Sequence, residues 1–98
     1  MQPVVFQVQN SEEFQDMVDR KDYRISKAIV EQLLNNIDNK RNKLLLFSVS
    51  YPTTTYDYMV ERKDFIDTLN QNLEICKREE DYETCGKIKE AIKKLENE

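Results

Sequence analysis

The sequence contains no histidine and no tryptophan, and its 98 residues include only one glycine, two prolines and two cysteines. Without histidine, the chain lacks the side chain that most often exchanges protons near neutral pH. With a single glycine, it has no glycine-rich loop in which backbone amides could hold a phosphate group. We therefore expect a protein that is not an enzyme and that has no catalytic residues, no cofactor and no metal site.

Long apolar segments are also missing. No stretch approaches the roughly 18 consecutive apolar residues of a transmembrane helix, and the first residues do not resemble a secretory signal. Two cysteines are too few for the disulfide framework of a small secreted protein. These absences predict a cytoplasmic protein with no membrane contact. Asn, Lys and Ile are abundant, which is typical of AT-rich genomes and suggests a phage-encoded protein.

Charge is what the sequence has in abundance. Charged residues make up 35% of the chain and hydrophobic residues 39%, with a formal net charge of -4. A chain this short buries only about two thirds of its unfolded surface. We therefore expect one domain, residues 1–98, that pairs with another protein or forms a homo-oligomer. The negative charge argues against a protein whose main task is to neutralise nucleic-acid phosphates.

Three segments have the two-residue alternation of β-strands, namely residues 3–9, 43–51 and 55–61. Pro52 and the three threonines that follow it indicate a turn between the second and third of these strands. A hairpin is therefore expected there. We predict a small antiparallel three-stranded sheet.

Helical periodicity covers the remaining segments. Apolar residues recur every three or four positions over residues 12–20, over 25–37 and throughout 62–98. Asn10 and Ser11 suit the start of the first helix, and Ser26 suits the start of the second. The sequence thus predicts an α+β fold in the order β-α-α-β-β-α-α. Residues 1–61 form its sheet-and-helix portion, and residues 62–98 form an antiparallel helical hairpin that projects from it.

The two cysteines fit the geometry of this hairpin. Folding the chain back around Glu80 and Asp81 places each apolar residue of the first helix opposite one of the second. Cysteine beside the turn lets the helices approach closely, so we interpret both as core residues. A disulfide under oxidising conditions and a metal or redox role are the alternatives, although a zinc site would lack the usual ligands. The predicted pairs are Cys76 with Cys85, Leu73 with Ile88, Leu69 with Ile92, and Ile66 with Leu95.

Residues 81–96, DYETCGKIKEAIKKLE, resemble the UVR motif, the short helical hairpin found in UvrB, UvrC and Clp-associated regulators. The likeness covers about 35 residues when the preceding helix is included. Cys85 and Gly86 replace the usual alanines, and Lys87 and Lys89 replace the usual arginines. In that family the hairpin binds other hairpins and carries no catalytic residues, so the resemblance implies contact between proteins. It does not carry over a role in DNA repair.

Together these patterns predict a noncatalytic intracellular adaptor or regulator that binds a partner protein or itself through the hairpin. Four apolar side chains are not used by the predicted seam between its helices. They must contact the sheet portion or a partner, and we treat them as candidate partner-binding residues: Phe65, Ile75, Tyr82 and Ala91.

Two alternative functions use a different surface. Tyrosines on a sheet can stack on bases, and basic residues in a neighbouring loop can bind phosphates, which predicts a nucleic-acid accessory protein. The same tyrosines could enclose a nucleotide-like small ligand at a dimer interface, or they could simply form a covered aromatic cluster. The residues concerned are Lys40, Arg41, Lys43, Tyr51, Tyr56 and Tyr58.

Overall fold

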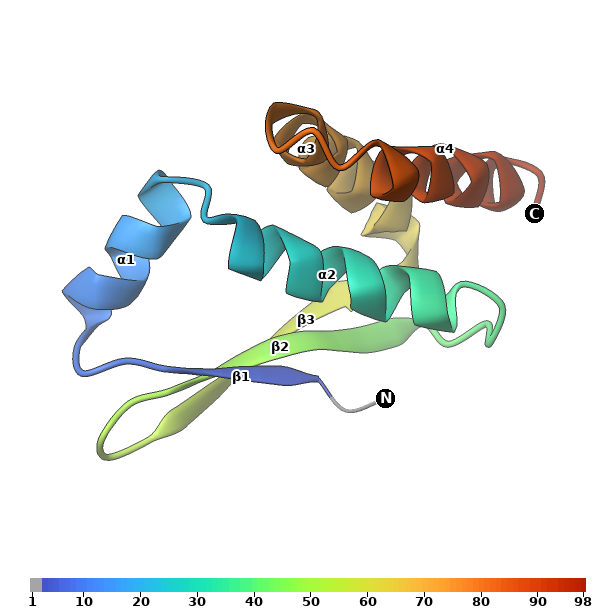
Figure 1. The fold of residues 1–98 in the computed structure, drawn as a ribbon. Coiled ribbons are helices and arrows are strands. Elements are labelled where there is room, and N and C mark those ends of the chain that lie inside the picture. The colour runs from blue at the N-terminus through green and yellow to red at the C-terminus, as the bar shows by residue number, and fades with distance from the viewer. Residues whose placement is uncertain (1–2) are drawn as a thin grey trace.

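The computed structural model describes residues 3–98, which form an α+β fold with the predicted element order (Figure 1). A short 3-10 turn joins the last strand to the hairpin. The elements are β1 (Val4–Gln7), α1 (Ser11–Asp19), α2 (Tyr23–Asn36), β2 (Lys43–Ser50), β3 (Thr55–Glu61), η1 (Arg62–Asp64), α3 (Phe65–Arg78) and α4 (Tyr82–Glu96).

The sheet has the strand order β1-β2-β3 and is mixed, so the prediction of an antiparallel sheet was wrong. β1 pairs with β2 in parallel, whereas β2 and β3 are antiparallel. The connections explain the difference. A tight turn after β2 places β3 beside it in the opposite direction. Between β1 and β2, by contrast, α1 and α2 form a crossover that carries the chain back, so β2 runs in the same direction as β1.

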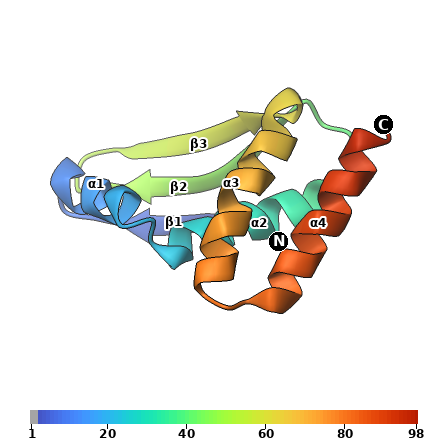
Figure 2. The same ribbon diagram turned by 90° about the horizontal axis from the view of Figure 1, so that it is seen from above.

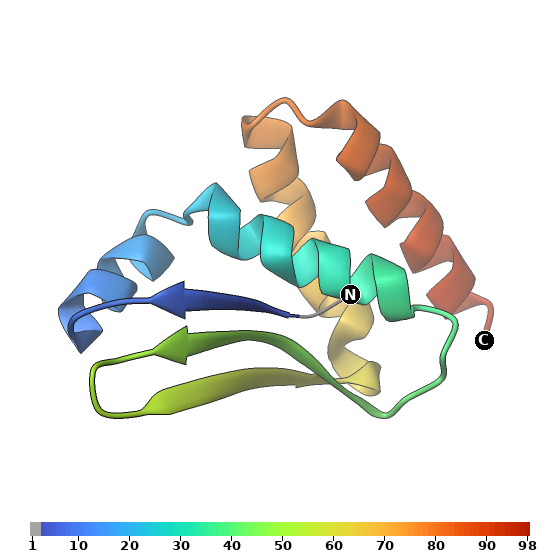
Figure 3. The same ribbon diagram turned by 60° about the horizontal axis from the view of Figure 1, so that its bottom comes forward.

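The helices cover one face of the sheet and leave the other open (Figures 1 and 3). Phe47 and Val49 of the central strand are buried on the covered face, where Phe47 contacts Phe14 of α1 at 6.2 Å between ring centres. Val5 of β1 and Met59 of β3 are on the open face and are 54% and 56% exposed. The sheet thus has its core on one side only.

Capping residues set the positions of the first two helices. The Asn10 side chain accepts a hydrogen bond from the Glu13 amide, as the sequence indicates for α1. The expectation of Ser26 as the cap of α2 was wrong. Asp22 caps this helix by accepting from the Arg24 amide, and its carboxylate also forms an ion pair with Arg24 at 2.8 Å. Ser26 is instead buried inside the helix.

α3 and α4 form the predicted antiparallel hairpin (Figure 2). Its turn uses Glu80, whose φ of 57° lies in the left-handed region, and Asp81, which caps α4. Cys76 and Cys85 are buried as free thiols beside this turn. Of the eight predicted seam residues, Ile66 and Ile92 are half-buried and the other six are buried. The hairpin does not project freely, because α3 packs on α2 as well as on α4.

Candidate functional site

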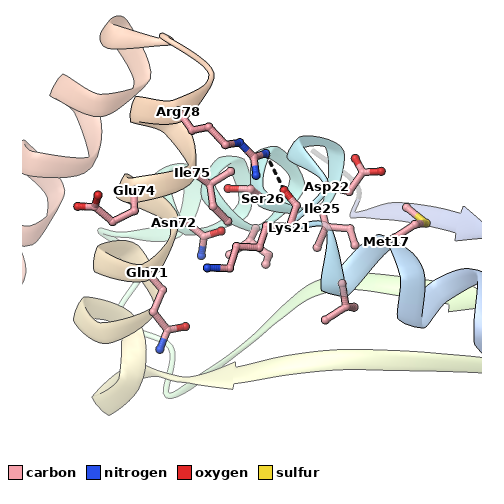
Figure 4. Close-up of a pocket in the computed structure, with 12 residues that line it drawn as sticks. Met17, Lys21, Asp22, Ile25, Ser26, Gln71, Asn72, Glu74, Ile75 and Arg78 are labelled. Carbon is pink, nitrogen blue, oxygen red and sulfur yellow. Dashed lines mark hydrogen bonds between the residues drawn. The ribbon is translucent and has the colours of Figure 1, made fainter.

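A groove of about 620 Å³ separates α3 from the corner between α1 and α2 (Figure 4). Its floor and walls are mostly apolar and include Met17, Ile25, Ile29 and Ile75. Val18 stands at its edge with 44% of its surface exposed. The groove therefore presents apolar surface to solvent at the contact between two parts of the chain that are far apart in sequence.

Polar groups lie among these apolar walls. Ser26 is 2% exposed, and its Oγ atom has no hydrogen-bond partner within residues 3–98. Asn72 of α3 is also buried, and its Nδ2 donates to the carbonyl of Thr68 at 2.8 Å. A buried hydroxyl without a partner is costly. Ser26 is thus a hydrogen-bonding group whose capacity the fold leaves unused.

Arg78 closes one end of the groove. Its guanidinium donates to the carbonyl of Lys21 at 2.8 Å (Figure 4). It also donates to the carbonyl of Arg20 at 3.3 Å, and both residues follow α1. Lys21 has a φ of 52°, a left-handed conformation that ends the helix. The Lys21 side chain is exposed, and its amine forms none of the ion pairs found within residues 3–98. Asp22 and Glu74 also line the groove, but they form ion pairs with Arg24 and Lys77, so among the described lining residues Lys21 contributes the unpaired charge.

A second set of hydrogen bonds links the hairpin turn to α2. The Tyr23 hydroxyl donates to the Asp81 carboxylate, which also accepts from the Thr84 hydroxyl at 2.8 Å. Burial, together with this hydrogen bond, raises the pKa of Tyr23. The bonds from Tyr23 and Thr84 lower the pKa of Asp81. These hydrogen bonds therefore join the hairpin turn to the start of α2, in addition to the packing of α3 on α2.

The candidate partner-binding residues fall into two groups. Ile75 is half-buried and lines the groove, and Tyr82 is 68% exposed at the start of α4. Phe65 and Ala91 are 1% and 4% exposed, because the chain's own core covers them. The guanidinium of Arg62 lies over the Phe65 ring, 5.4 Å from its centre. Of the four, only Ile75 and Tyr82 are thus accessible to a partner, and only Ile75 lines the groove.

The structure does not bring the basic loop and the tyrosine pair together. Lys40 and Arg41 precede β2, whereas Tyr51 follows it. The eight residues of β2 span roughly 26 Å at about 3.3 Å each. Tyr51 and Tyr56 make an edge-to-face contact at 5.7 Å near the far end of that strand, where Tyr56 pairs with Val49. Lys43, the first residue of β2, lies with the loop.

The tyrosines themselves are partly internal. Tyr58 stacks on the buried Phe47 at 4.8 Å and contacts Phe14 at 5.6 Å, as in a covered aromatic cluster. Burial raises the pKa of Tyr58. Tyr51 and Tyr56, by contrast, line an open cavity of about 500 Å³ near the β2–β3 turn. This cavity is the place where the small-ligand alternative would apply.

The sequence indicated Ile75 as a candidate but did not predict the groove that it lines. Each of its walls contributes ordinary amphipathic residues, and only the packing of α3 on α2 places them together. The resulting site offers apolar contacts, a buried hydroxyl and charged residues of both signs, which suits the binding of a ligand or peptide.

Comparisons of the chain with protein-family models, with curated proteins and with solved structures find no match. Within residues 3–98, no helix combines the length and the apolar character needed to cross a bilayer. Functional inference therefore rests on the groove and on the surfaces around it.

Proposed function

We propose that this protein is a noncatalytic interaction module, an adaptor or regulator, that binds a partner protein through the groove between α3 and the α1–α2 corner. The observation that carries this proposal is the largely apolar groove beside the hairpin, with the candidate residue Ile75 in its wall. The UVR-like hairpin pattern supports the same kind of role, since hairpins of that family bind proteins.

The chemistry of the groove specifies the partner segment. Apolar walls around Ile25 and Ile75 suit a few apolar side chains from one face of an amphipathic segment. Lys21 at the rim would face an acidic residue of that segment. Tyr82, exposed on the hairpin, would extend the contact beyond the groove.

A pull-down from native host lysate, with and without nuclease, tests this proposal. Val18→Glu places a charge at the groove edge without disturbing the core, because Val18 is 44% exposed. Gln15→Glu is the matched control, since it adds the same charge to an exposed position of the same helix. We expect a protein captured by the wild type to be lost with Val18→Glu and retained with Gln15→Glu, whether or not nuclease is present.

Two variants refine the result. Lys21→Glu should weaken capture if the partner presents an acidic residue, and Tyr82→Ala should weaken it if the contact reaches the hairpin. Equal capture by the wild type and Val18→Glu would overturn the groove as the binding site. Capture that disappears with nuclease would favour the nucleic-acid alternative at Lys40, Arg41 and Lys43, which predicts affinity that falls steeply with salt.

The cavity beside Tyr51 and Tyr56 supports a second candidate function, the binding of a small nucleotide-like ligand. Such a ligand would stack on the exposed Tyr56 ring, which is 57% exposed. Thermal unfolding against a panel of nucleotides tests it, because a ligand that binds only the folded state raises the melting temperature. The increase should disappear in Tyr56→Ala.

A further inference from the structure

The outer edge of β3 is unprotected. β3 is an edge strand of the sheet, and no other element of residues 3–98 lies beyond it (Figures 2 and 3). Of the seven large apolar side chains most exposed among these residues, three are on this strand: Tyr56, Tyr58 and Met59. The strand contains no proline or lysine, two of the residues that commonly prevent edge strands from pairing, and its charged residues are Asp57 and Glu61.

The hydrogen bonds at its two ends show which backbone groups are free. At one end the Tyr51 amide donates to the carbonyl of Thr54 at 2.7 Å, and at the other the Arg62 amide donates to the carbonyl of Asn42 at 2.7 Å. In an antiparallel pair, alternate residues direct both backbone groups to the partner strand. Even-numbered residues of β3 therefore bond to β2, and the odd-numbered residues Thr55, Asp57, Met59 and Glu61 direct theirs outward.

We propose that this edge pairs with the same edge of a second copy of the chain, in an antiparallel register centred on Tyr58. In this register Asp57 lies opposite Met59 of the second copy, and Thr55 lies opposite its Glu61. Every outward N–H and C=O group of the strand then has a partner. The two sheets join into one continuous sheet.

Side-chain pairing selects this register over its neighbours. On the covered face it places Tyr58 against its symmetry mate and Tyr56 against Val60, which are favourable aromatic and aromatic–aliphatic cross-strand pairs. A register centred on Asp57 would place two Asp57 carboxylates directly opposite each other. A register centred on Met59 would place Asp57 opposite Glu61. Like charges in such positions are destabilising, so the Tyr58-centred register is favoured.

The Asp57 carboxylate does not prevent this pairing. It accepts a hydrogen bond from the Ser48 hydroxyl at 2.6 Å, which draws it toward the central strand and away from the edge. The edge of β3, residues 55–61, shares no residue with the lining of the groove. It is thus a second surface, made of other residues than the one that binds a partner in the proposed function.

Sedimentation equilibrium of the full chain tests the proposal. The wild type should have the mass of two chains, in a concentration-dependent equilibrium with one. Met59→Asp places a negative charge opposite Asp57 and should weaken the dimer, whereas Met59→Lys places a positive charge there and should tighten it. Because each pair occurs twice, the expected change in dissociation constant is roughly 2- to 30-fold in either direction.

Cross-linking tests the register directly. A mixture of Asp57→Cys and Met59→Cys chains should form a disulfide between the two new cysteines on mild oxidation, identified by peptide mass spectrometry. Each variant alone should not, because its cysteines would lie on a diagonal about 7–8 Å apart. Thermal unfolding of every variant confirms that it folds. A wild type that remains one chain at all concentrations, or equal effects of Met59→Asp and Met59→Lys, would overturn the proposal.

Discussion

Leu69 of α3 offers the sharpest test of how the helical hairpin is held on the rest of the fold. Its side chain is 0% exposed, on a helix that packs on both α2 and α4. Leu69→Ala removes buried methyl groups and leaves a cavity, a change that costs about 2.7–5.0 kcal/mol in well-packed cores. A domain of this size has a free energy of unfolding of about 5–15 kcal/mol. The variant should therefore lose a large share of its stability.

Leu34→Ala is the matched control, since it makes the same chemical change at a half-buried position of α2. Partial exposure leaves fewer contacts to lose, so we expect a cost of about 1–2 kcal/mol. Urea and thermal unfolding, followed by circular dichroism, measure both. For a domain this small, each kcal/mol shifts the melting temperature by about 4–8 °C, so Leu69→Ala should lower it by more than about 10 °C. Equal losses for the two variants would refute the placement of Leu69 in the core.

Three further measurements address individual contacts. Arg62→Ala should lower the free energy of unfolding by about 1–3 kcal/mol, because Arg62 donates to the carbonyl of Ile37 at 3.0 Å from a site where its side chain is 16% exposed. Glu98→Gln removes the exposed partner of the Arg62–Glu98 ion pair and leaves Arg62 in place. It should lower the free energy of unfolding by less than about 1 kcal/mol, and urea unfolding measures both variants. Burial raises the pKa of the Cys76 thiol to about 11, so at pH 8 a thiol reagent should modify Cys76 only as fast as the chain opens. Rapid labelling of the folded protein would contradict that burial. The pKa of Asp81 is lower in the folded state than in the unfolded chain, so its contribution to stability is complete above about pH 4 and is lost as the pH falls through the folded value. Asp81→Asn should therefore flatten the acid limb of stability measured between pH 7 and pH 2.

Much of the secondary structure could be predicted from local sequence. The alternation in residues 55–61 and the three- and four-residue steps in residues 62–98 reflect the repeat of each element, and the structure confirms both. Asn10 and Asp81 cap helices where the sequence indicates, because capping depends on a side chain and the amides two or three residues beyond it. These interactions join residues that are close in sequence, so the sequence alone is enough to predict them.

The errors came from interactions between segments. β1 is parallel to β2 because the helices between them cross over the sheet, and the alternation within a strand is the same for either direction. Ser26 fits a cap by residue type, but Asp22 begins the helix earlier and forms an ion pair with Arg24 there. Phe65 and Ala91 appear outside the two-helix seam, yet the structure buries both.

The candidate sites divide in the same way. The sequence by itself determined the helical hairpin with its two cysteines on the inner side, and a β3 whose aromatic residues alternate with polar ones. Those features depend on the period of each element and on turn chemistry. The tertiary structure alone decided that α3 packs on α2 and creates the groove at Ile75, and that β3 is an edge strand with free backbone groups. Both depend on which segments, distant in sequence, pack on each other. Residues such as Val18 and Met59 become exposed apolar surface because that packing leaves them uncovered.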